Sequence, residues 1–175
     1  VWGEELYKIV TDICQLQPDF ESWKDGDLRL IDEGAPSLSG GQRTRVALAR
    51  CLYYWNEASL FLLDDIFLNL DPNVGLKIFQ RLFGPFGFLN QNHSKAILSI
   101  DLASLLYYLS PQAKGGVCHS NVFVLHLNNH GIFFFGPLNN YLSLIRHKNS
   151  TTSIHSPILI PITSSTCMTT CTQLS

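Results

Sequence analysis

Hydrophobic and polar positions follow one another along this chain in patterns that predict helices and strands in turn. Apolar residues at helical spacing predict helices over residues 4–14, 42–53, 72–83 and 102–109. Continuous apolar runs predict buried strands at residues 60–63 and 96–100, because a strand covered on both faces needs no alternation. This succession of strands and helices favours an α/β domain with a mainly parallel sheet.

A hairpin and a tail follow this region. Strands predicted over residues 121–127 and 132–135 flank an Asn-Asn-His-Gly turn, whose glycine tolerates the positive φ of a tight hairpin. A last helix is expected from Pro137. We therefore predict one domain over residues 1–147. Residues 148–175 are rich in Ser and Thr, and we expect them to form a linker or disordered tail without packed structure.

The most informative polar pattern is Leu-Ser-Gly-Gly-Gln at residues 38–42, directly before a predicted helix. Ser39 is a good N-cap, which places Gly40 and Gly41 in the first helical turn. Phosphate binding at a helix start requires accessible N–H groups, small residues and the positive end of the helix dipole, and this segment offers all three. By itself, so short a pattern also fits an ordinary N-cap with glycines in a tight turn.

A pair of carboxylates closes the predicted strand at residues 60–63. Asp64 and Asp65 therefore lie at the carboxyl end of a strand, where α/β sheets present ligands. Because successive strand residues point to opposite faces, we expect the two side chains to have different roles. One would bind Mg²⁺ and the other would face an attacking water. Alone, the doublet also fits a solvated pair at a strand end.

Composition narrows the possibilities further. A chain of 175 residues that is 46% hydrophobic can bury one core, or can be part of a larger domain. The net charge of −2 comes without a basic stripe, which argues against a nucleic-acid partner. The five cysteines lack the paired spacing of a zinc site or disulfide framework, so we expect reduced thiols. No apolar run is long enough for a membrane span.

Taken together, these segments resemble the second half of an ATP-binding cassette (ABC) nucleotide-binding domain, a P-loop NTPase-like fold. In that family, residues 38–42 would be the ABC signature, the strand with Asp64 and Asp65 the Walker B motif, and Asn69-Leu70-Asp71 the D-loop. The resemblance extends from about Glu4 to Arg146. Finer features are similar to the first nucleotide-binding domain of C-subfamily, multidrug-resistance-associated exporters. They are residues 16–19, the Asp64-Asp65 doublet in place of Asp-Glu, Val74-Gly75 with Ile78-Phe79, and residues 84–87.

The resemblance implies ATP and Mg²⁺ as cofactors. ABC domains work as head-to-tail pairs, so Ser39, Gly40, Gly41 and Gln42 would contact ATP held by a second nucleotide-binding domain. Asp64 would bind Mg²⁺, and Asp71 would belong to the D-loop beside the nucleotide. The partners would be that second domain and the transmembrane domains of a parent exporter, at the cytoplasmic face of a membrane.

The chain departs from the family pattern in three ways. It contains no Gly-x-x-x-x-Gly-Lys-Ser/Thr loop, so we expect a cassette fragment that lacks the Walker A strand and is inactive alone. Asp65 stands where the family has a glutamate; its shorter side chain makes it a weak general base. Asp101 follows the strand at residues 96–100 where the switch histidine is expected, and its negative charge would repel a γ-phosphate.

These departures leave several interpretations open. The leading hypothesis is part of an exporter cassette that couples ATP binding and hydrolysis to transport. A catalytically degenerate regulatory or scaffolding half-cassette is the main alternative, favoured by Asp65 and Asp101. A soluble ABC protein of translation or DNA repair would need a basic surface or zinc ligands. An unproductive truncated gene product is the fourth possibility, because a missing strand exposes an edge of the sheet.

Overall fold

A computed structural model describes residues 3–31, 38–55, 60–110, 122–128, 131–147 and 157–161. Its helices are α1 (Glu4–Ile13), α2 (Gln17–Ser22), α3 (Gly40–Tyr53), α4 (Pro72–Phe83), α5 (Phe88–Gln91), α6 (Leu102–Tyr108) and α7 (Leu138–His147), with a 3₁₀ turn at Gly26–Leu28. Its strands are β1 (Phe61–Leu63), β2 (Ala96–Ser99), β3 (Val122–Asn128), β4 (Gly131–Pro137) and β5 (Pro157–Pro161). The predicted α/β class is confirmed.

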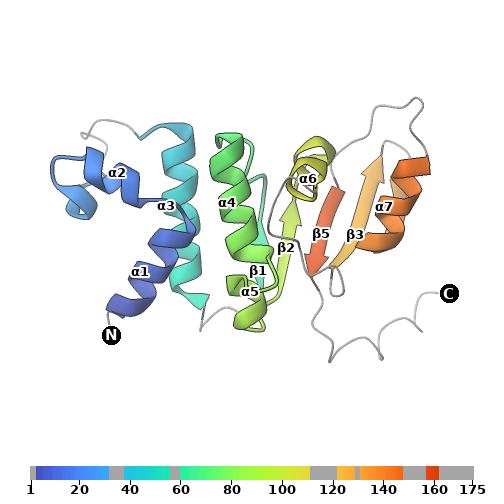
Figure 1. The fold of residues 1–175 in the computed structure, drawn as a ribbon, viewed down its shortest axis with the longest axis horizontal. Coiled ribbons are helices and arrows are strands. Elements are labelled where there is room, and N and C mark those ends of the chain that lie inside the picture. Colours follow the sequence, from blue (N-terminus) through green and yellow to red (C-terminus); the bar gives the residue numbers. More distant parts are fainter. Residues whose placement is uncertain are drawn as a thin grey trace.

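The strands form one mixed sheet in the order β1-β2-β5-β3-β4, of which Figure 1 labels the first four. β1 and β2 are parallel, with Phe61 opposite Ala96 and Leu63 opposite Leu98. β5 is antiparallel to both β2 and β3, so β2 and β3 run in the same direction. The predicted hairpin is confirmed by the antiparallel pairing of β3 with β4; residues 129–130 of its turn lie outside the described residues.

Strand β5 comes from the segment in which we expected no packed structure. Its sequence, Pro-Ile-Leu-Ile-Pro, is a short apolar run with β-branched residues inside a Ser- and Thr-rich segment. Such residues favour strands, and the flanking prolines stand at the strand ends, where a missing N–H is tolerated. The Ser- and Thr-rich composition of residues 148–175 as a whole did not reveal this short apolar run. The other residues of the predicted tail, 148–156 and 162–175, lie outside the described part of the chain.

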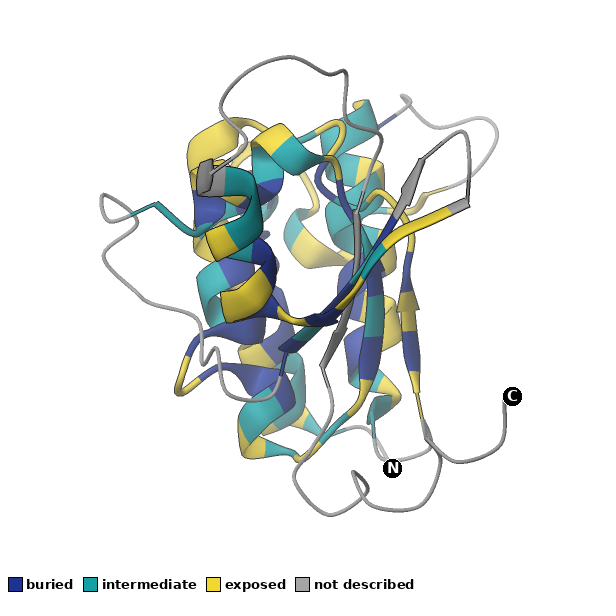
Figure 2. Cartoon of the chain, turned by 90° about the vertical axis from the view of Figure 1, so that its right-hand side faces the viewer, coloured by how far each residue is buried: buried dark blue, intermediate teal, exposed yellow. Residues whose placement is uncertain are grey.

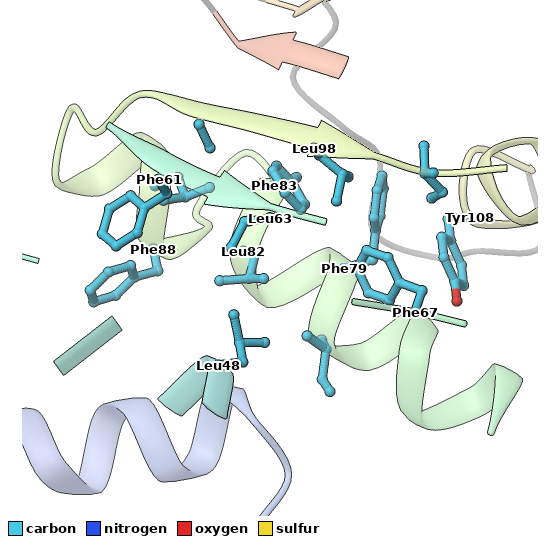
Figure 3. Close-up of a cluster of buried hydrophobic side chains, with 14 of the residues drawn as sticks. Leu48, Phe61, Leu63, Phe67, Phe79, Leu82, Phe83, Phe88, Leu98 and Tyr108 are labelled. Atoms are coloured by element: carbon cyan, nitrogen blue, oxygen red, sulfur yellow. The ribbon is translucent and has the colours of Figure 1, made fainter. Parts of the chain in front are cut away.

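Most of the core lies between the helices and one face of the sheet. Phe61 and Leu63 of β1, Leu98 of β2 and Val124 of β3 are all buried. In Figure 2 the buried residues, in dark blue, gather where helices and strands meet. Figure 3 shows the aromatic part of this core, in which the Tyr108 ring lies 5.0 Å from the rings of both Phe67 and Phe79.

The opposite face of the sheet is open in the described part of the chain. Leu62 lies between the buried Phe61 and Leu63, yet its exposed fraction is 69%. The prediction that this strand is covered on both faces is therefore wrong here. The apolar run is explained by two hydrophobic faces, only one of which is covered by helices. Phe135 of β4 is also exposed on the surface.

Two helices were not predicted. Pro18, Gly26 and several acids favour a turn-rich connection over residues 15–30, but α2 forms there, because proline is favoured in the first turn of a helix. The short helix α5 follows a Gly-Pro-Phe-Gly segment. The other predicted helices are confirmed to within two residues at each end. They are α1, α3, α4 and α6, and α7 begins one residue after the predicted start at Pro137.

Candidate functional site

Helix α3 begins at the predicted cap. The Ser39 hydroxyl oxygen accepts the Gln42 N–H at 3.2 Å, and the Gln42 side-chain oxygen accepts the Ser39 N–H at 3.0 Å. This reciprocal pair is a capping box, which fixes the backbone at the helix entry. Gly40 and Gly41 are the first two helical residues, so helix geometry gives their N–H groups no acceptor inside the helix. These groups form the helix mouth, as we call it below.

The helix mouth opens onto a cleft shared with the segment before α4. Ser39, Gly40 and Gly41 line one side of the cleft. The residues lining the rest of it are Arg45, Asn69, Leu70, Asp71 and Val74. The structure thus brings the predicted signature and D-loop residues together at one surface site. The N–H groups at the start of α3 suit an anionic ligand.

Asp71 has a structural role of its own at this cleft. It is the N-cap of α4, and its Oδ1 accepts the N–H groups of Asn73 at 2.9 Å and Val74 at 3.3 Å. Pro72 at the first helical position supports the same start. The Asp71 carboxylate therefore fixes the start of α4 at the edge of the cleft.

Asp64 and Asp65 lie just beyond β1 and approach the same hydroxyl group. Ser99, the last residue of β2, donates its hydroxyl hydrogen to Asp64 at 2.5 Å. The Ser99 oxygen lies 3.3 Å from Asp65 Oδ1 and accepts the Asp65 N–H at 2.8 Å. The expected separation of the two carboxylates onto opposite faces is wrong. Asp65 has φ of 45°, in the left-handed region, so the chain leaves the strand geometry that the expectation assumed.

The oxygen atoms at this end of the sheet fit the requirements of Mg²⁺. Asp64 and Ser99 offer a carboxylate and a hydroxyl, which are hard oxygen ligands. Within the described ranges, no cluster of three or more His, Cys, Asp or Glu side chains forms a complete metal site. Mg²⁺ often uses one or two carboxylates and takes its other ligands from phosphates and water. Asp64 is therefore a suitable partial ligand.

Asp101 acts as a helix cap in the structure. It is the N-cap of α6, and its Oδ1 accepts the Ser104 N–H at 2.9 Å. Burial raises the pKa of Asp101, but hydrogen bonds from Ser104, Ala103 and its own backbone outweigh burial, and the net pKa is lowered. The group is therefore held ionised. Because β1 and β2 are parallel, Asp101 follows β2 at the end of the sheet where Asp64 follows β1.

Sequence reasoning did not identify two residues that contribute to the site region. Ser99 bridges the carboxylates; the available signal was one hydroxyl residue inside the apolar run at residues 96–100. Asp19 of α2 is buried and binds the side chains of Gln42 and Arg45. Its signal was weaker, because both partners lie more than twenty positions further along the chain.

Known proteins share this segment of sequence. The chain is 40% identical over 98 residues to the ABC transporter FGM5 of Gibberella zeae, which covers 56% of this chain and 6% of the relative. It is 41% identical over 85 residues to the vacuolar heme ABC transmembrane exporter abc3 of Schizosaccharomyces pombe. This match covers 49% of this chain and 6% of the relative. It is 40% identical over 89 residues to ATP-binding cassette sub-family C member 2 of Mus musculus. This match covers 51% of this chain and 6% of the relative.

The homologues of this chain are ABC transporters. The predicted resemblance, including that to the C subfamily, is confirmed, and the α/β structure agrees with a partial ABC cassette. The chain spans about 6% of the length of these relatives. No protein-family model matches it. Among the residues with described structure, no helix has the length and apolar character that a membrane crossing requires.

Proposed function

We propose that this segment is part of the nucleotide-binding cassette of an ABC exporter. In this proposal Ser39, Gly40, Gly41 and Gln42 bind the terminal phosphate of ATP held by a second nucleotide-binding domain. The single observation that carries the proposal is the capped helix mouth, which opens onto a cleft shared with Asn69 and Asp71. Homology to ABC transporters supports the use of ATP, generally with Mg²⁺, by the parent protein.

Each part of the cleft has a separate task in this proposal. The N–H groups of Gly40 and Gly41, together with the positive end of the α3 dipole, stabilise the phosphate charge. The absence of a side chain on Gly40 lets the phosphate approach the backbone closely, whereas the absence of one on Gly41 admits the Asn69 carbonyl oxygen. Asp71 keeps the loop of Asn69 in place by capping α4. At the other site, Asp64 would hold Mg²⁺, which bridges and neutralises phosphate oxygens when bound.

ATP-dependent pairing tests this function. The 175-residue chain is mixed with a nucleotide-binding domain of a C-subfamily exporter that carries a complete Gly-x-x-x-x-Gly-Lys-Ser loop. Sedimentation velocity then compares a non-hydrolysable ATP analogue plus Mg²⁺ with ADP plus Mg²⁺. The proposal predicts a heterodimer with the triphosphate analogue and mainly separate chains with ADP. Equal association with the two nucleotides would contradict it.

A second candidate function is a half-cassette that pairs without completing its own hydrolytic site. The observation that favours it is the role of Asp101, whose carboxylate caps α6 where a histidine would face the nucleotide. Asp65 is also displaced from strand geometry by its positive φ. The test replaces both residues in a complete transporter carrying this segment, as Asp65→Glu with Asp101→His. A regulatory role predicts unchanged transport, whereas a strong rise in ATPase activity would contradict it.

A further inference from the structure

Helix α2 contacts the start of α3 through one buried acid. Asp19 has an exposed fraction of only 8%. Its Oδ1 accepts a hydrogen bond from Gln42 Nε2 at 2.9 Å, and its Oδ2 forms an ion pair with Arg45. A buried carboxylate is costly unless it is paired and hydrogen-bonded, and Asp19 has both kinds of partner.

The Gln42 side chain connects this acid to the capping box. Its oxygen accepts the Ser39 N–H, while its NH₂ group donates to Asp19. An ionised carboxylate can only accept hydrogen bonds, so Asp19 selects the amide orientation in which the NH₂ group faces it. The opposite orientation would place the amide oxygen against the Asp19 carboxylate and the NH₂ group against the Ser39 N–H. Asp19 therefore favours the orientation that closes the box.

Arg45 adds a second connection on the same side of α3. Its Nη1 donates to the Gln15 carbonyl oxygen at 2.6 Å and pairs with Asp19, and the residue also lines the cleft. The ion pair satisfies the largely buried guanidinium and ties α3 to α2, and the hydrogen bond ties α3 to the segment before α2. The start of α3 is thus held to α2 and to the segment before it by the side chains of Gln42 and Arg45.

We propose that Asp19 is a positioning residue for the helix mouth. It fixes the Gln42 amide and Arg45, and so holds the N–H groups of Gly40 and Gly41 in the geometry that an anion requires. The positioning itself is a property of this chain. Only its consequence for ATP rests on the proposed function.

A reciprocal exchange of acid and amide tests this role. Asp19→Asn places an amide opposite the Gln42 amide, and Gln42→Glu places a carboxylate opposite Asp19. The double variant Asp19→Asn/Gln42→Glu restores one donor and one acceptor with the original total charge, and the glutamate introduced at position 42 can still accept the Ser39 N–H as in other capping boxes. Asp12→Asn is the matched control, because Asp12 forms a more exposed ion pair between helices, with Arg81.

The measurement is amide hydrogen exchange at Ser39 and Gln42 in the 175-residue chain, without nucleotide. Each single variant should speed exchange there by about tenfold, the loss expected for a weakened cap. The double variant should return to within about threefold of the original chain, and Asp12→Asn should leave these amides unchanged. Unchanged exchange in the single variants, or a double variant no better than either, would overturn the role of Asp19.

The pairing assay separates this proposal from the proposed function. If the original chain pairs with ATP, Asp19→Asn should weaken pairing about tenfold and Asp12→Asn should not. Equal pairing by Asp19→Asn and the original chain would overturn the consequence for ATP. Absence of any ATP-dependent pairing by the original chain would contradict the proposed function and leave the exchange result to decide the role of Asp19.

Discussion

The carbonyl oxygen of Asn69 lies 2.8 Å from the place where a β-carbon on Gly41 would stand. A β-carbon at Gly40 would instead meet the Asn69 side chain at 3.6 Å, an ordinary contact distance. The two adjacent glycines therefore serve different purposes. Gly41 permits the close approach of the loop before α4, whereas Gly40 leaves room at the helix mouth.

This difference predicts that replacing the two glycines with alanine will affect the stability of the chain unequally. Gly41→Ala should lower the free energy of unfolding by about 1–3 kcal/mol, because the Asn69 backbone has to move. Gly40→Ala should change it by no more than about 0.5 kcal/mol. Urea unfolding of both variants checks the prediction. Equal losses at the two positions would show that the close approach does not control stability.

A similar close approach between α4 and α6 gives a second prediction. A β-carbon on Gly75 would lie 2.4 Å from the Tyr108 hydroxyl oxygen. Tyr108 cannot easily move away, since its ring is packed against Phe67 and Phe79. Gly75→Ala should therefore cost about 1–3 kcal/mol, and Tyr108→Phe should recover part of that loss by removing the oxygen. Additive losses in a double-mutant cycle would argue against this contact.

Asp101 predicts a specific dependence of stability on pH. Its pKa is lowered in the folded chain, so the native state holds fewer protons at this group than the unfolded state does. Its contribution is fully present above the ordinary value of 3.8 and is lost as the pH falls through the lower folded pKa. The variant Asp101→Asn keeps a capping oxygen but cannot titrate. Urea unfolding should therefore show that the stability advantage of the original chain over this variant shrinks in acid. An advantage that grows in acid would contradict the lowered pKa.

The open face of the sheet predicts a difference between two neighbouring leucines. We expect this exposed apolar face to promote self-association of the chain, which Leu62→Ala should weaken. The same change should affect stability little, because the Leu62 side chain is mostly exposed. Leu63→Ala should cost about 2–5 kcal/mol, because Leu63 is buried in the core. Sedimentation velocity at several concentrations, with urea unfolding, separates the effects. Self-association unaffected by Leu62→Ala would mean that this apolar face does not mediate it.

Local signals in the sequence were sufficient for several elements. The Ser39 cap and the start of α4 at Asp71-Pro72 depend on residues within one helical turn, and both are present as predicted. The open face at Leu62 could not be predicted, because hydrophobicity reports a preference for burial and not the presence of a cover. The shared contact of Asp64 and Asp65 with Ser99 depends on a positive φ at Asp65, which two adjacent acids do not reveal.

Contacts between distant residues were the hardest to anticipate. Asp19 and Arg45 are separated by 26 positions, and the helix that carries Asp19 was itself not expected. Strand β5 shows the same limitation, since its five residues pair with β2 and β3 from within a polar segment. Periodicity predicts which residues form an element, but pairing partners are decided by the assembled fold.

The most direct test of the central claim is a charge placed at the helix mouth. Gly40→Glu introduces a carboxylate beside the proposed phosphate position, and Gly40→Gln introduces a neutral side chain of nearly the same shape. In a titration with the Walker A-bearing partner domain and a non-hydrolysable ATP analogue, Gly40→Glu should pair about tenfold more weakly than Gly40→Gln, because like charges repel. Equal affinities for the two variants would contradict phosphate binding at Gly40 and Gly41.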